Sequence, residues 1–278
     1  MTQRGPEDGA ADDAEALPGL DTAVANPARV WNYWVGGKDN FAADREVGQQ
    51  VLELLPAMPM IARYARRFLS DAVRRLSAAE GIRQFLDIGT GLPTAENTHE
   101  VAQKAAPEAR IVYVDNDPVV LAHARALLTS SPEGKTGYVA ADLRDTDTIL
   151  AGAEQILDFS QPVAVLLIAI LHFIPDADDP HRIVARLMDA VPSGSYLAIV
   201  HAASDIQAET VAEGMGLYNQ MSSTPITMRS RAQVARFFDG LDLVRPGVVP
   251  LDEWWSPDQV EPGAVGRLAG YAGIARKP

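Results

Sequence analysis

The spacing of hydrophobic residues changes near residue 81 of this 278-residue chain. Before that point apolar residues recur every three or four positions, which is typical of helices that bury one face. The clearest such stripe lies in 60–80 and comprises Ile61, Ala65, Phe68, Leu69, Ala72, Val73 and Leu76. After residue 81 short apolar runs alternate with amphipathic segments. This alternation predicts an α/β fold with a mostly parallel sheet and helices on both faces.

The alternating part predicts seven strands and the helices that connect them. We expect strands over 84–88, 110–115, 136–140, 163–171, 195–201, 241–248 and 269–276. We expect helices over 42–55, 60–80, 94–106, 118–130, 146–157, 180–191 and 230–239. Residues 203–229 do not fit the alternation and predict an insertion at the carboxyl edge of the sheet. Because open α/β sheets bind ligands at that edge, this insertion is expected to be either a substrate lid or a packing interface.

The N-terminal part divides into a polar tail and a helical segment. Residues 1–25 are acidic and poor in large apolar side chains, so we expect a disordered tail. Residues 26–81 predict a helical cover, in which Trp31, Trp34 and Val35 share one helical face. Residues 82–278 form the expected ligand-binding domain.

The amino-acid composition limits the classes of molecule that the protein is expected to bind. The net charge of −13 disfavours nucleic acid, since nonspecific phosphate binding depends on clustered Lys and Arg. The absence of cysteine excludes disulfides and a cysteine nucleophile. No apolar run is long enough for a membrane span or resembles a signal peptide. We therefore expect a cytoplasmic, bacterial protein that acts on a small molecule and binds neither nucleic acid nor membrane.

The segment 85–94 contains the strongest binding motif. An apolar run ends in Asp87 and is followed by Gly89, Thr90 and Gly91, which is typical of a strand that enters a glycine loop and then a helix. The glycines allow close approach of the backbone to a ligand. A carboxylate at Asp87 would repel a pyrophosphate and suits a cationic adenosine cofactor. S-adenosylmethionine is therefore the expected ligand.

Two further acids strengthen this interpretation. Asp115 ends the next strand, 24 residues beyond Gly91, where a carboxylate can accept both ribose hydroxyl protons. Asp142 follows the third strand and is expected near the adenine amino group. The adjoining Asn116 and Leu143 are expected to contact the same ligand. An NAD-dependent oxidoreductase is an alternative, disfavoured by Asp87 and by the absence of a third loop glycine at Thr94.

From about residue 26 onward the chain resembles a family of S-adenosylmethionine-dependent methyltransferases of high-GC bacteria, long classed as a domain of unknown function. The resemblance rests on 34–41, 85–94, 113–118 and 231–238. It implies a Rossmann-like class I methyltransferase fold whose last strand is antiparallel, with S-adenosyl-L-methionine as cofactor and no assigned acceptor. Pro93 stands where many such enzymes carry a third glycine and removes one backbone donor.

The N-terminal segment also contains expected cofactor ligands. By resemblance to enzymes with helical N-terminal extensions, Tyr33, Gly37 and Asn40 are placed beside the cofactor, where an aromatic face attracts a desolvated cation. The alternative is that the aromatic residues only anchor the helices. Arg66 is a candidate partner for the methionine carboxylate, although an arginine at this position is more often solvated.

A final candidate follows the most apolar strand. Ala169 is expected at the cofactor, and His172 stands at the cleft as the best available general base, or as a residue that shapes the pocket. No histidine pair has metal-ligand spacing, so we predict no metal. The function expected is methyl transfer to a small molecule; a noncatalytic S-adenosylmethionine-binding regulatory module is the alternative from another class.

Overall fold

The computed structural model describes residues 21–127, 129–264 and 268–278. Most of the expected acidic tail, residues 1–20, lies outside them. Within the described residues the centre is an eight-stranded sheet with the order β3-β2-β1-β4-β5-β8-β6, and β7 pairs with β8.

The sheet has a parallel half and an antiparallel edge. The parallel strands are β1 Gln84–Ile88, β2 Arg110–Asp115, β3 Lys135–Ala140, β4 Ala164–Ile168 and β5 Tyr196–Ala202. Strand β8, Gly270–Arg276, runs antiparallel between β5 and the short β6, Asp242–Leu243, and also pairs with β7, Val249–Pro250. This order and the reversed strand confirm the class I methyltransferase fold. A dinucleotide-binding fold of order 3-2-1-4-5-6 lacks the reversed insertion.

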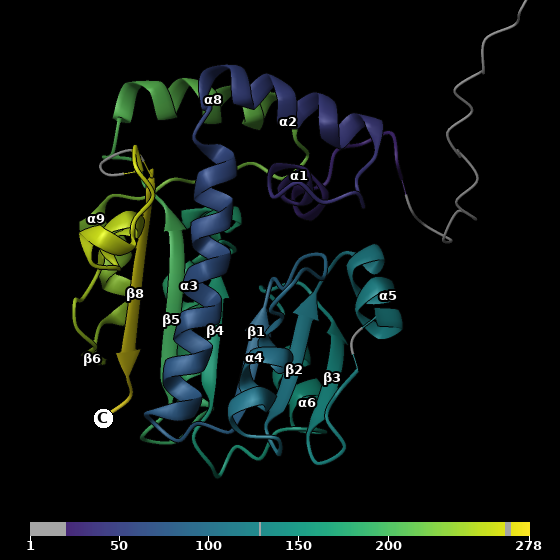
Figure 1. Ribbon diagram of the computed structural model, residues 1–278, viewed down its shortest axis with the longest axis vertical. Helices are drawn as coiled ribbons and strands as arrows, with labels where there is room; N and C mark the ends of the chain where they lie inside the picture. The colour runs from purple at the N-terminus through teal and green to yellow at the C-terminus, as the bar shows by residue number, and fades with distance from the viewer. Residues whose placement is uncertain (1–20, 128, 265–267) are drawn as a thin grey trace, which may run out of the picture.

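Helices cover both faces of the sheet. Figure 1 shows α3, Met58–Ala78, and α4, Thr98–Ala105, in front of the strands. The other face carries α6 Thr146–Ala153, α7 Pro180–Asp189 and α9 Arg231–Ala235, while α5, Pro118–Leu127, flanks β2 and β3. The alternation of strand side chains produces two cores: Phe85 packs with the stripe of α3, whereas Leu86 packs in the opposite core. Each such buried side chain contributes about 1.5–3 kcal/mol to folding.

Three helices lie across the edge toward which the parallel strands point: α1 Pro27–Trp34, α2 Ala42–Leu54 and α8 Ala208–Met221 (Figure 1). The expected insertion 203–229 contains α8, which packs on the N-terminal helices. A Cβ atom at Gly214 would lie 2.5 Å from Leu55 Cδ1, so the missing side chain allows this close approach. The N-terminal helices and the insertion thus form one cover over the strand ends.

Several element boundaries differ from the sequence prediction. The strand expected over 163–171 ends at Ile168, because Ala169 adopts φ +58° and a 3₁₀ turn follows at Leu171–Phe173. The strand expected over 241–248 is reduced to β6, whose two residues are exposed and at the sheet edge. The helix expected over 94–106 begins at Thr98, where the Glu100 carboxylate accepts from Asn97 N at 2.8 Å.

Candidate functional site

Two adjoining cavities lie between the strand ends and the helical cover. The first, about 400 Å³ in volume, follows the ends of β1, β2 and β3, and we call it the strand-end cavity. The second, about 620 Å³, lies between α1, α3, α8 and β5, and we call it the apolar cavity. Pro27, Trp31, Ala169 and Phe173 line both. A molecule in one cavity therefore faces a molecule in the other across these four residues.

Two buried carboxylates stand at the strand-end cavity. Asp87 Oδ2 accepts from Thr98 Oγ1 at 2.6 Å, and burial raises the pKa of Asp87 to about 6. Asp115 accepts from Gly91 N and Asp117 N, each at 2.9 Å, and burial raises its pKa to about 6 as well. Two of the three strand-end acids predicted from the sequence thus line one cavity and are held by neighbouring backbone or hydroxyl groups.

The glycine loop between these acids is shaped by close contacts. Gly89 and Gly91 have φ values of +73° and +66°, a region that favours glycine. A Cβ atom at Gly89 would lie 2.6 Å from Ile170 Cγ1. Thr90 Oγ1 donates to the Asp87 carbonyl at 3.0 Å and closes the turn. Gly89, Thr90 and Gly91 all line the strand-end cavity, as expected for a loop that approaches a ligand.

The far rim of the strand-end cavity carries the third acid. Asn116 Nδ2 donates to Asp142 Oδ2 at 3.3 Å, and Leu143 lines the cavity beside them. Arg144, which sequence reasoning missed, pairs with Asp142 at 3.0 Å and also lines the cavity. The sequence does carry one sign of this pairing, because the basic Arg144 stands two positions after Asp142. Asp142 is therefore a half-buried carboxylate paired with an arginine, unlike the two buried ones.

Arg66 is half-buried, and the tip of its guanidinium group is enclosed. It extends from α3 to the strand-end cavity, and its Nη2 is buried without a hydrogen-bond partner among the described residues. Burial lowers the pKa of its guanidinium, an effect that the nearby Asp87 carboxylate opposes. The Nη2 atom of Arg66 therefore does not lie on a solvated face. A buried donor without a partner favours an anionic group on a ligand.

The N-terminal segment approaches the cavity differently from the prediction. Tyr33, Gly37 and Asn40 do not line the strand-end cavity, whereas Asn32 does. Tyr33 Oη donates to Gln49 Oε1 at 2.8 Å, and Asn40 Nδ2 donates to Asn32 Oδ1 at 2.8 Å. Hydrogen bonds inside the cover thus occupy the side chains of Tyr33 and Asn40, and direct contacts of Tyr33, Gly37 and Asn40 with a cofactor stay a prediction. Helical spacing alone does not identify which residue of the turn faces the cavity.

A buried ion pair connects the cover to the sheet. Arg29 Nε on α1 bonds Asp44 Oδ2 on α2 at 2.9 Å, and Arg29 Nη1 lies 3.7 Å from Asp117 Oδ2. All three side chains are almost fully buried. Asp117 also donates its backbone N–H to Asp115. The position of α1 is thus linked to the carboxylate at the end of β2.

His172 and His201 line the apolar cavity, and among the described residues His172 has a buried ring nitrogen without a hydrogen-bond partner. His201 Nδ1 lies 2.8 Å from the Ala202 carbonyl, and Arg229 Nη1 donates to its Nε2 at 2.9 Å. Burial lowers the pKa of His201 to about 3. His172, in the 3₁₀ turn after β4, has a buried Nδ1 without a hydrogen-bond partner among the described residues. Burial places the pKa of His172 well below its usual value, so this imidazole is neutral.

Ala169 and His172 occupy different positions relative to the cavities. Ala169 lines both, whereas His172 lines the apolar cavity alone. Among the described residues we find no group of three metal-ligating side chains, and no helix there is long and apolar enough to cross a membrane. The residues that line both cavities, Pro27, Trp31, Ala169 and Phe173, carry no titratable side chain, and the neutral imidazole of His172 lies on the apolar-cavity side of this boundary.

Comparison with known proteins identifies the family. Residues 13–278 match the family model described as S-adenosyl methyltransferase. A DUF574 family protein from Streptomyces avermitilis is 44% identical, with 93% of this chain and 99% of that chain covered and a TM-score of 0.89. A candidate methyltransferase from Thermobifida fusca is 38% identical, with 94% and 97% covered and a TM-score of 0.84. No curated protein matches. The chain belongs to the S-adenosyl methyltransferase family.

Proposed function

We propose that this member of the S-adenosyl methyltransferase family transfers a methyl group from S-adenosyl-L-methionine to a small molecule. The donor would occupy the strand-end cavity and the acceptor the apolar cavity. The observation that carries this proposal is the boundary shared by the two cavities at Trp31, Ala169 and Phe173. Transfer requires the two reacting atoms in line and in contact, and holding them so contributes about 7–11 kcal/mol to lowering the barrier.

The strand-end cavity matches the chemical groups of the donor. The Asp115 carboxylate would accept from the ribose hydroxyls, while Asn116, Asp142 and Leu143 would surround the adenine. Arg66 would hold the methionine carboxylate, which supplies the partner that its buried Nη2 lacks. Asp87, placed beneath the glycine loop, favours the positively charged end of the donor. When bound, this cofactor supplies an electrophilic methyl group on a sulfonium.

The cover would exclude water from the reacting groups. Helix α1 lines the strand-end cavity through Trp31 and Asn32, and α8 lines the apolar cavity through Val211, Met215 and Tyr218. We propose that 26–81 and the 203–229 insertion act together as the cover of the catalytic domain 82–278. The adjoining second cavity favours this enzyme over a noncatalytic binding module, because a module needs only the first.

Calorimetry with the full chain tests the proposal. We expect S-adenosylmethionine and S-adenosylhomocysteine to bind with one site each and NADH not to bind. The variant Asp115→Ala should lose this binding while its thermal unfolding stays cooperative, because its proposed partner is the ligand's ribose. Tight NADH binding without S-adenosylmethionine binding would refute the proposal. Release of S-adenosylhomocysteine on incubation with pools of small molecules separates the enzyme from the noncatalytic module.

A further inference from the structure

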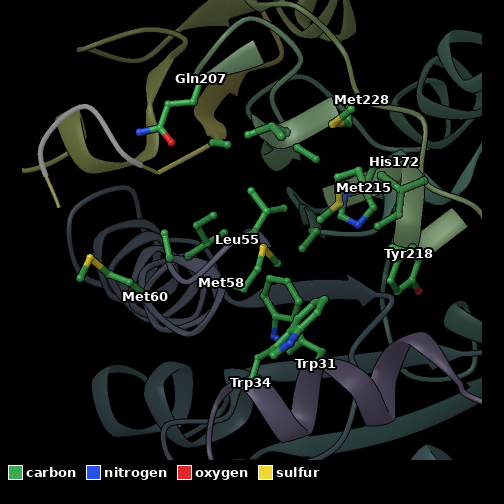
Figure 2. Close-up of a pocket in the computed structure, with 18 of the residues that line it drawn as sticks. Trp31, Trp34, Leu55, Met58, Met60, His172, Gln207, Met215, Tyr218 and Met228 are labelled. Atoms are coloured by element: carbon green, nitrogen blue, oxygen red, sulfur yellow. The ribbon is translucent and has the colours of Figure 1, made fainter. Parts of the chain in front are cut away.

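The apolar cavity has walls suited to a bulky, flat ligand. Trp31 and Trp34 meet edge to face with ring centroids 6.2 Å apart on one wall, and the His172 and Phe173 rings lie 4.4 Å apart on another. In Figure 2 the side chains of Trp31, Met58 and His172 point into the same space. Methionine side chains adapt their shape and contact aromatic rings favourably. The volume of about 620 Å³ is that of a pocket for a drug-sized molecule.

The walls also carry no charge. None of the described residues that line the apolar cavity is Asp, Glu, Lys or Arg. His172 and His201 are neutral because burial lowers the pKa of each, and burial raises the pKa of Tyr218 to about 12. A charged ligand would lose its hydration here without gaining a counter-ion. The cavity therefore selects against ammonium, carboxylate and phosphate groups.

One polar group lies close to the strand-end cavity. His172 is adjacent to Phe173, which lines both cavities, and its Nδ1 is buried without a partner among the described residues. Arg229 holds the backbone of this turn, since Nη1 donates to the Leu171 carbonyl at 3.2 Å and Nη2 to the Ile174 carbonyl at 2.8 Å. A ligand hydroxyl both donates and accepts, so it can pair with Nδ1 in either neutral tautomer.

We infer that the apolar cavity binds an uncharged polycyclic aromatic molecule whose hydroxyl lies beside His172 and is methylated there. This inference rests on the proposed function for its methyl donor. The hydroxyl oxygen forms the new bond to the methyl carbon as the bond from that carbon to sulfur breaks, and the sulfur keeps the electron pair as a neutral thioether. The hydroxyl proton passes to His172 Nδ1, which accepts it in the tautomer that carries hydrogen on Nε2, and then to water.

Matched naphthalene derivatives test the inference with the full chain. Binding of 2-naphthol, naphthalene and 6-hydroxy-2-naphthoate is measured by ligand-observed NMR, with and without S-adenosylhomocysteine. We expect 2-naphthol to bind at least about tenfold more tightly than the carboxylate, which buries an unpaired charge. We expect it to bind about tenfold more tightly than naphthalene, which leaves His172 unpaired. With S-adenosylmethionine present, mass spectrometry should detect the methyl ether of 2-naphthol.

Three variants locate the binding. Met215→Trp should fill the cavity and weaken 2-naphthol binding at least about tenfold, and unchanged S-adenosylhomocysteine affinity shows that the variant is folded. Gly216→Ala, one residue away on α8 and facing open space, is the matched control and should leave both affinities unchanged. His172→Phe should equalise the affinities for 2-naphthol and naphthalene, an effect that a merely structural role would not produce.

The outcomes separate this inference from the proposed function. Equal binding of 2-naphthol and 6-hydroxy-2-naphthoate overturns the inference, as does 2-naphthol binding that Met215→Trp leaves unchanged. Failure of every neutral derivative to bind up to its solubility limit also overturns it. Failure of S-adenosylmethionine to bind refutes the proposed function instead, and the naphthalene series measured without cofactor still decides the chemistry of the cavity.

Discussion

Acidification tests the strand-end cavity, because two of its carboxylates titrate close to neutrality. Burial raises the pKa of both Asp87 and Asp115 to about 6. The proposed donor carries a positive charge and two ribose hydroxyls, so it favours the ionised form of each carboxylate. Its affinity should therefore fall as the pH decreases through 6.

The magnitude follows from the ionised fractions. A carboxyl with a pKa of about 6 is ionised in about ten of eleven molecules at pH 7 and in about one of eleven at pH 5. Each group that must ionise therefore weakens binding about tenfold over this interval, so the two groups together weaken it by up to about a hundredfold. The ligand's own carboxyl and amino groups titrate outside the interval.

Folding stability of the free protein should change with the opposite sign. The unfolded carboxyls release their protons near pH 3.8, whereas the folded ones hold them to about pH 6. Between these values the folded state binds more protons, so the free energy of unfolding decreases as the pH rises, by about 3 kcal/mol for each fully buried group. The rise in melting temperature caused by the ligand should accordingly grow from pH 5 to pH 7.

Calorimetry with S-adenosylmethionine at pH 5, 6 and 7 measures the affinity of the positively charged donor, and differential scanning calorimetry measures the stability. Asp115→Asn removes one titrating group, so the pH dependence of its remaining affinity should be about half as steep on a logarithmic scale. A dissociation constant that stays the same from pH 5 to pH 7 would refute the assignment of these carboxylates to the ligand.

Three further changes test individual contacts. Arg66→Met should weaken S-adenosylhomocysteine binding by about tenfold or more by calorimetry, since a charged hydrogen bond is worth about 1.5–3 kcal/mol; unchanged affinity would contradict its role. Gly214→Ala should lower the free energy of unfolding in urea by about 1–3 kcal/mol through overpacking, whereas Gly216→Ala should raise it by up to about 1 kcal/mol. Arg29→Met should cost about 3–5 kcal/mol in the same assay because the Asp44 carboxylate is left buried without a counter-ion; a loss below 1 kcal/mol would contradict this.

The central strands were predictable because their burial is unambiguous. Strands β1 and β2 match the predicted ranges, since they are buried on both faces and each is followed by a polar turn. Asp87 and Asp115 lie at the ends of these strands and also line the strand-end cavity, so the prediction of the strands and the prediction of the site depend on the same residues. The expected strand over 241–248 lacked that signal, because an edge strand is exposed and its pairing with β8 depends on the rest of the sheet.

Side chains of the cover were less predictable, because tertiary packing decides their direction. Tyr33 and Asn32 are adjacent in α1, yet only Asn32 lines the strand-end cavity. Arg66 lies on an arginine-rich helix, and its burial follows from the strand ends beneath it rather than from its local pattern. A helical period identifies the buried face, but it does not separate residues that contact a ligand from those that contact other side chains.

The two cavities also differ in how far the sequence predicts them, because tertiary packing assembles one of them more than the other. The part of the strand-end cavity that follows β1, β2 and β3 comes from short segments in which an acid or a glycine is required at a fixed place after a strand, so the sequence carries a visible motif. The apolar cavity is assembled from α1, α2, α3, α8 and the turn after β4, each of which contributes apolar residues indistinguishable from core. Donor binding therefore constrains residue types locally, whereas acceptor binding constrains the shape formed by distant segments. Substitutions such as Met215→Trp should then change acceptor preference and leave donor affinity intact.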